Sequence, residues 1–247
     1  MKLRLIPLSI ASAALACASA AVFSAESAPA PMPPVGVLAP GVKDGKVIFD
    51  TVCAACHGTQ GEGKSELKSP AIAGLPDWYS KPQIEGFRKG RRGHDVKDPQ
   101  SLMMAAIAKT LQPEQIDAVV GHMAKLERVT PAGIEREPKD ADLANGMLSF
   151  QERCMECHRY NASGEMAFGS PPLIGQQGWY MISQIEKFKN GQRGTVKGDV
   201  NGAKMVLSSS FIEDEKMLRD IVAYILTLNP EPAAPPDVKS PFETGTR

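Results

Sequence analysis

The sequence predicts an all-α protein in which one small helical domain occurs twice. The chain has 247 residues, and it matches itself without a gap at a spacing of 101 residues, as from Cys53 to Cys154. Apolar residues recur at helical spacing near the end of each copy, and no alternating apolar run indicates a sheet. Because this period is far longer than that of a solenoid repeat, each copy is predicted to be a separate small domain.

Composition fits a globular protein and excludes one broad class of partner. Hydrophobic residues make up 43% of the chain, and 28 Lys and Arg residues balance 28 Asp and Glu residues. This hydrophobic content is sufficient for a packed core. A chain without a net positive charge is not expected to bind nucleic acid. Aromatic residues amount to only 6%, which fits a core partly filled by something other than side chains.

The N-terminus has the pattern of a secretory signal peptide. Lys2 and Arg4 precede an uncharged stretch that is rich in Ala and Ser and continues to Phe23. The alternative, an uncleaved membrane anchor, is disfavoured by Pro7 and several serines. The protein is therefore expected in the periplasm, and membrane association would come only through a partner or an uncleaved N-terminus. Cys17 lies in this segment, which leaves four of the five cysteines for the remaining chain.

Six segments are expected along the chain, with the linker and the two arms inferred from their Pro and Gly content. They are a signal peptide at 1–25, a Pro-rich arm at 26–40, the first domain at 41–129, a linker at 130–140, the second domain at 141–228 and a Pro-rich tail at 229–247.

Three helices are predicted in each domain. The first leads into a cysteine motif, the second ends at a glycine, and the third carries apolar residues at i, i+3, i+4 and i+7. The pairs of predicted helices are Lys43–Cys53 with Asp142–Cys154, Trp78–Gly90 with Trp179–Gly191, and Pro113–Leu126 with Glu213–Leu228. Between Arg193 and Met205 the second copy is expected to form a Gly-rich loop.

Both first helices end in a Cys-x-x-Cys-His motif, for which three chemistries are known. A structural zinc site would have to join the cysteines of both copies and would leave the histidines without a role. A thioredoxin-like redox pair belongs in a βαβ context, which is absent. The third chemistry is covalent attachment of haem c, in which the cysteines form thioethers and the histidine binds iron. Export and duplication favour this third interpretation. Two haem c groups are therefore predicted, held by Cys53, Cys56 and His57, and by Cys154, Cys157 and His158.

Methionine is the predicted sixth iron ligand in both copies. Outside the motifs the only histidines are His94 and His122, and neither has a histidine at the matching position of the other copy. Met104 and Met205 stand at equal distances before the first apolar residue of the last helix, and Met103 remains the alternative in the first copy. These methionines could also be core fillers. Ligation by His and Met fills both axial positions and favours electron transfer over substrate chemistry.

The order of motifs resembles class I cytochrome c. Each copy has the cysteine motif after a short helix, a downstream Pro and Gly, a helix with a Gln-Ile-x-x-Phe-x-x-Gly-x-Arg pattern, a Met and a closing amphipathic helix. The duplication resembles the dihaem cytochrome c4 group, over about residues 41–228. The resemblance implies two tandem class I cytochrome c domains in a pseudo-twofold arrangement. It also implies that Phe49 packs against His122 and Phe150 against Tyr224, where the first and last helices cross.

Further haem contacts are predicted from residue chemistry and from the resemblance. The resemblance implies that the carbonyls of Pro70 and Pro171 accept the N–H of the ligating imidazoles. Side chains that could donate hydrogen bonds to haem propionates are Arg92, Arg193, Trp78, Trp179, Tyr79 and Tyr180. The alternative is that these aromatic residues are core residues and that the arginines are solvated.

The predicted function is transfer of single electrons by a periplasmic dihaem cytochrome. The expected partners are redox proteins: a quinol-oxidising complex or dehydrogenase as the donor, and a terminal oxidase or reductase as the acceptor. The alternative is a dedicated electron-transfer subunit of a respiratory or sulfur-oxidising enzyme. The chain is not expected to be an enzyme itself, since a dihaem peroxidase would need an open sixth position at one iron.

Overall fold

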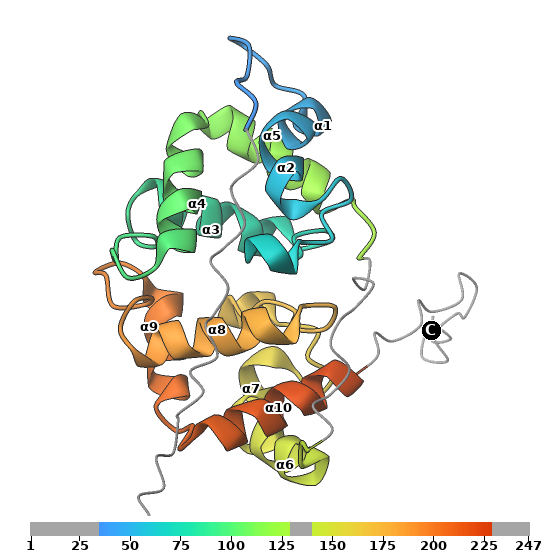
Figure 1. Cartoon of the computed structure of the whole chain (residues 1–247), viewed down its shortest axis with the longest axis vertical. Coiled ribbons are helices and arrows are strands. Elements are labelled where there is room, and N and C mark those ends of the chain that lie inside the picture. The colour runs from blue at the N-terminus through green and yellow to red at the C-terminus, as the bar shows by residue number, and fades with distance from the viewer. Residues whose placement is uncertain (1–34, 129–139, 229–247) are drawn as a thin grey trace, which may run out of the picture.

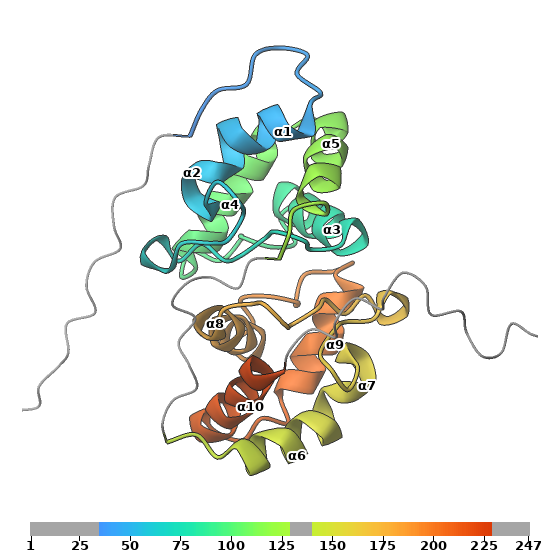
Figure 2. The same cartoon turned by 90° about the vertical axis from the view of Figure 1, so that its right-hand side faces the viewer.

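The computed structural model describes residues 35–128 and 140–228. These two ranges form two helical domains, one above the other in Figure 1, and Figure 2 shows the same separation from the side. The predicted signal peptide and tail, most of the Pro-rich arm and most of the linker lie outside the described residues.

The all-α fold class is confirmed, because the described residues form helices and no strand. The helices of domain 1 are α1 (Gly45–Ile48), η1 (Phe49–Cys53), α2 (Ala54–His57), η2 (Ser65–Leu67), α3 (Asp77–Arg88), α4 (Pro99–Thr110) and α5 (Pro113–Met123). The helices of domain 2 are α6 (Leu143–Arg153), α7 (Met155–His158), η3 (Met166–Phe168), α8 (Gly178–Lys189), α9 (Val200–Ser209) and α10 (Glu215–Thr227). All six predicted helices are present among them.

The helices α4 and α9 were not predicted, although each has a clear start signal. The side chain of Asp98 accepts a hydrogen bond from the backbone N–H of Ser101 at 3.1 Å, and that of Asp199 accepts one from Gly202 at 3.0 Å. Such N-caps satisfy donors that the first turn leaves unpaired. The Gly-rich loop expected before Met205 is therefore shorter than predicted, since α9 begins at Val200.

In each domain the first and last long helices cross at a glycine beside an aromatic contact. The ring centroids of Phe49 and His122 are 5.4 Å apart, and those of Phe150 and Tyr224 are 5.6 Å apart. Both contacts confirm the packing that the resemblance implied. The partly buried His122 thus packs against the core of domain 1, where Phe49 is fully buried.

The crossing at Gly146 predicts a strong effect of a single methyl group. A Cβ atom there would lie 2.0 Å from the backbone oxygen of Asp220. Replacing Gly146 with Ala must therefore separate α6 from α10, and we expect a loss of stability of about 1–3 kcal/mol or more. Gly121→Ala is the control, because a Cβ there meets nothing within 4 Å, and alanine stabilises a helix. Thermal unfolding of both variants is the measurement. A wild-type melting temperature for Gly146→Ala would contradict this account of the crossing.

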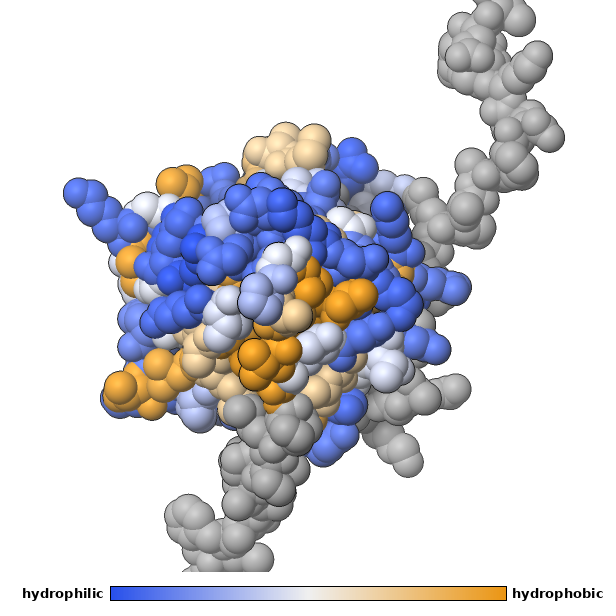
Figure 3. Space-filling model, turned by 90° about the horizontal axis from the view of Figure 1, so that it is seen from above, coloured by the Kyte–Doolittle hydropathy of each residue, from blue (hydrophilic) through white to orange (hydrophobic). Residues whose placement is uncertain are grey.

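Both polar and apolar residues are exposed at the domain 1 end of the molecule. Figure 3 looks down on the domain 1 end and shows an apolar area among hydrophilic residues. Val47 in α1 and Val37 in the segment that precedes α1 are exposed at this end. In the part of the chain that the structure describes, no helix is both long and apolar enough to cross a membrane.

Candidate haem sites

Helical structure holds each cysteine motif together at the edge of a cavity. In domain 1 the motif spans the end of η1 and all of α2. In domain 2 Cys154 stands between α6 and α7, and the rest of the motif lies in α7. Burial, and secondarily the neighbouring motif cysteine, raises the pKa of Cys53 and of Cys154 to about 12. As free thiols, before haem is attached, both cysteines are therefore neutral at physiological pH.

The two motifs do not meet. Each lies beside a different cavity, and the cysteines at 53, 56, 154 and 157 form no disulfide. Within residues 35–128 and 140–228, no cluster of three or more His, Cys, Asp or Glu side chains could hold a metal. The shared zinc site considered from the sequence would need all four cysteines at one point, and this fold keeps them apart.

A proline carbonyl orients each motif histidine. Nδ1 of His57 lies 2.8 Å from the carbonyl oxygen of Pro70, and Nδ1 of His158 lies 2.9 Å from that of Pro171. Burial lowers the pKa of both histidines, and the carbonyl contact opposes this shift. A neutral imidazole that donates from Nδ1 keeps its Nε2 lone pair for a metal. The geometry thus fits the role that the resemblance implied for the two prolines.

The two cavities each run from a cysteine motif to a methionine helix. The cavity of domain 1 has a volume of about 370 Å³, and both Met103 and Met104 on α4 line it. The cavity of domain 2 has a volume of about 320 Å³, and Met205 on α9 lines it. Met104 also packs against the small core cluster around Phe87. Histidine and methionine are therefore brought to the same cavity in both domains.

The two cavities share part of their walls at the domain boundary. The residues that line both of them are Leu75, Tyr79, Gln83, Arg92, Tyr180 and Gln184. Arg193 lines only the domain 2 cavity. Trp179 belongs to domain 2 but lines the domain 1 cavity, whereas Trp78 lies outside both walls, with its ring edge-on to Tyr79.

Two arginines and two glutamines join the domains in a ring of hydrogen bonds. The amide oxygen of Gln83 accepts from Arg92 at 2.7 Å and from Arg193 at 3.0 Å. The amide oxygen of Gln184 accepts from Arg193 at 2.7 Å and from Arg92 at 3.2 Å. Each glutamine thus binds one arginine of its own domain and one of the other. Each arginine also stacks on a phenyl ring of its own domain, Phe87 or Phe188.

These walls fit a haem with its propionates near the boundary. Arg92 is 7% exposed, and neither Arg92 nor Arg193 forms an ion pair within the described residues. Burial lowers the pKa of Arg92, and the charge of Arg193 lowers it further. Nε of Arg92 and Nε1 of Trp179 are buried donors without a protein partner. A buried unpaired donor costs about 1–3 kcal/mol, and a carboxylate acceptor would remove that cost.

Several residues that build this boundary were not predicted from the sequence. Gln83 and Gln184 occupy matching positions, and their repetition beside the matched arginines was the available signal. Gln176, Gln177 and Lys187 also reach across the boundary. They have no counterparts in the first copy, so self-comparison could not find them.

Two helical domains, each with a Cys-x-x-Cys-His motif, a carbonyl-bound histidine and a methionine on one cavity, define a dihaem electron-transfer protein of the c type. A model of the cytochrome c family matches residues 42–127 and 143–229. The chain therefore belongs to the cytochrome c family, is similar to cytochrome c4, and carries two covalently bound haem c groups.

Known relatives include electron acceptors and a cytochrome c4. The chain is 29% identical over 170 residues to the thiosulfate dehydrogenase electron acceptor of Stutzerimonas stutzeri (strain A1501), over 66% of this chain and 73% of that protein. It is 26% identical over 187 residues to cytochrome c4 of Pseudomonas aeruginosa PAO1, over 72% of this chain and 84% of that protein. A solved structure of thiosulfate dehydrogenase (TsdBA) from Marichromatium purpuratum superposes with a TM-score of 0.58 and 30% identity, over 74% of this chain and 39% of that chain.

Proposed function

We propose that this chain is a periplasmic electron carrier that passes single electrons between its two haems and two protein partners. The main support is the shared wall of the two cavities, because residues such as Tyr79 and Arg92 border both sites. Haem c supplies a one-electron couple when it is bound. The protein contributes covalent attachment, axial ligation and a boundary that shields both groups from water.

Met104 and Met205 are the proposed sixth ligands. Each lies six residues after the aspartate that caps its helix, Asp98 or Asp199, so the two helices present them in the same register. The residue that matches Met103 in the second copy is Lys204, which is exposed. The duplication therefore favours Met104 over Met103. The proposed haem c attachment sites are Cys53 with Cys56 and Cys154 with Cys157, and the proposed fifth ligands are His57 and His158.

The proposed electron donor is a periplasmic dehydrogenase of the thiosulfate-oxidising kind, and the proposed acceptor is a terminal oxidase or reductase. The donor class rests on the likeness to a thiosulfate dehydrogenase electron acceptor and to the TsdBA structure. The periplasmic location rests on the N-terminal sequence pattern and on the covalent haem, which bacteria attach outside the cytoplasm. With Met at both sixth positions, the chain has no open iron site for catalysis.

Rapid mixing of the oxidised holoprotein with a thiosulfate dehydrogenase and thiosulfate tests this function. We expect both haems to be reduced, and no reduction by thiosulfate without the dehydrogenase. Reduction by thiosulfate alone would show that the chain is itself an enzyme. Reduction only by a quinol-oxidising complex would move the donor to the respiratory chain. Co-elution with a catalytic subunit from native extracts would favour the dedicated-subunit alternative over a diffusing carrier.

A further inference from the structure

Two adjacent glutamines of domain 2 hold a loop of domain 1. The side chain of Gln177 accepts a hydrogen bond from the backbone N–H of Ala71 at 2.9 Å and donates one to the carbonyl of Glu62 at 3.1 Å. Gln176 donates to the carbonyl of Ala71 at 3.1 Å. Both glutamines are at most 6% exposed. Three backbone groups of domain 1 thus have their partners in the other domain.

The held loop is the one that orients the histidine of domain 1. Ala71 follows Pro70 directly, and the carbonyl of Pro70 lies 2.8 Å from Nδ1 of His57. A carbonyl that accepts a hydrogen bond from Nδ1 fixes the imidazole and raises its basicity as a ligand. The position of the Pro70 carbonyl therefore depends on Gln177, across the boundary.

Among the described residues, the matching positions of domain 1 give the histidine loop of domain 2 no equivalent support. The residues that match Gln176 and Gln177 in the first copy are Leu75 and Pro76, which have no side-chain amide. The residue that matches Ala71 is Pro172, which has no backbone N–H to satisfy. The contact is therefore one-sided by sequence.

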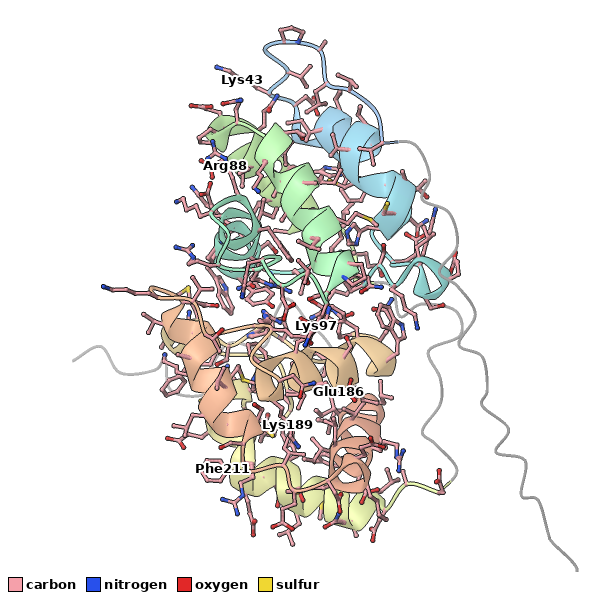
Figure 4. All side chains as sticks on the ribbon, turned by 60° about the vertical axis from the view of Figure 1, so that its left-hand side comes forward. Lys43, Arg88, Lys97, Glu186, Lys189 and Phe211 are labelled. Atoms are coloured by element: carbon pink, nitrogen blue, oxygen red, sulfur yellow. The ribbon has the colours of Figure 1, made fainter. Side chains whose placement is uncertain are left out.

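A second one-sided contact reaches the methionine helix of domain 1. Nζ of Lys187 on α8 lies 2.7 Å from Oδ1 of Asp98, whose side chain caps α4. Figure 4 shows Lys97, the neighbour of Asp98, beside the boundary, and Glu186, the neighbour of Lys187, on the facing helix. The side chain of Asp98 is 3% exposed and that of Lys187 is 15% exposed, so solvent screens this pair little. The residue that matches Lys187 is Gly86.

We propose that domain 2 positions both axial ligands of the domain 1 iron, through Gln177 on the histidine side and Lys187 on the methionine side. The reduction potential in domain 1 then depends on these two contacts with domain 2, and the matching positions of domain 1, Pro76 and Gly86, supply no such contacts in return. Gln177 and Lys187 are positioning residues, since neither ligates the iron. This inference rests on the proposed haem ligands.

The two residues are expected to move the domain 1 potential in opposite directions. Without Gln177 the Pro70 carbonyl is less well held, and a weaker hydrogen bond to His57 makes the imidazole a poorer donor. The oxidised iron is then less stabilised, so the potential rises. Without Lys187 the buried carboxylate of Asp98 loses its counter-charge. The helix α4, which carries Met104, also loses its ion pair with domain 2. Both effects favour the oxidised iron, so the potential falls.

The test compares the holoprotein with Gln177→Met and Lys187→Met, which keep the side-chain length. Gln60→Met and Lys189→Met are the controls, because Gln60 is exposed and Lys189 bonds within domain 2, to the carbonyl of Ile212. Spectroelectrochemical titration, with haem-resolved NMR to assign each potential, is the measurement. We expect Gln177→Met and Lys187→Met each to shift the domain 1 reduction potential by about 59 mV, which is a tenfold change in the electron distribution between the domains. The domain 2 potential and both controls should stay unchanged.

Each outcome bears on a different claim. Equal shifts at both haems, or a lower melting temperature with unchanged potentials, would overturn the inference and leave a merely structural contact. Fewer than two haems per chain in the wild-type protein would instead overturn the proposed ligand sets. If Gln177→Met does not fold, Lys187→Met decides the question, because Lys187 is the more exposed residue.

Discussion

Replacing Met104 with leucine is expected to lower the reduction potential of the domain 1 haem by on the order of 0.2 V, within the roughly 0.8 V over which axial ligands move haem potentials. A thioether stabilises reduced iron relative to oxidised iron, and leucine offers no lone pair. Met104 lines the domain 1 cavity and not the domain 2 cavity. The haem of domain 2 should therefore keep its reduction potential. Redox titration should resolve the change, and the methionine-to-iron absorption band should lose about half of its intensity.

Met103→Leu is the matched control for this experiment. Met103 precedes Met104 on the same helix and lines the same cavity, so both changes remove one thioether from one wall. We expect the Met103 variant to keep both potentials and the full absorption band. The reverse result, with the loss in the Met103 variant only, would transfer the ligand role to that residue.

Replacing Cys154 and Cys157 together with serine is expected to leave one covalent haem per chain and to unfold domain 2. An unfilled cavity costs about 24 cal/mol for each Å³. The cavity of about 320 Å³ in domain 2 would then cost roughly 8 kcal/mol if its walls did not collapse. This is comparable with the whole stability of a typical domain, about 5–15 kcal/mol. Mass spectrometry of the intact chain and thermal unfolding by circular dichroism measure both effects.

Cys17→Ser provides the comparison for the cysteine variant. Cys17 lies in the predicted signal peptide, so its loss should leave two haems per chain and an unchanged melting curve. Two haems in the Cys154 and Cys157 variant would contradict the assignment of this pair to covalent attachment.

The fold was predictable because the sequence contains it twice. A motif such as Cys-x-x-Cys-His is ambiguous alone, but its recurrence with matched glycines and aromatic residues restricts both copies to the same structure. The crossings at Gly45 and Gly146, with Phe49 and Phe150 beside them, were implied by the resemblance of this repeated pattern to class I cytochrome c. The resemblance to class I cytochrome c also implied that the proline carbonyls lie next to the histidines.

Other features depended on contacts between residues that are distant in sequence. The helix α4 contains small and methionine residues without a strong apolar stripe, so only the capping Asp98 and the proline that follows it marked its start. Arg92 was predicted beside a propionate, but its bonds to Gln83 and Gln184 depend on how the domains meet. Gln177 and Lys187 have no repeat partners, so nothing in the sequence distinguished them from surface residues.

The ring of Arg92, Gln83, Arg193 and Gln184 looks the same from either domain. Its arrangement is that of an isologous contact in a twofold homodimer, in which one surface patch binds the same patch on a second copy. A single domain with one such Arg and Gln therefore has the groups required to pair with itself. A homodimer would have to carry every change in this patch twice. Because the copies share one chain, each can change alone, and a one-sided contact such as that of Gln177 with Ala71 is open only to the fused form.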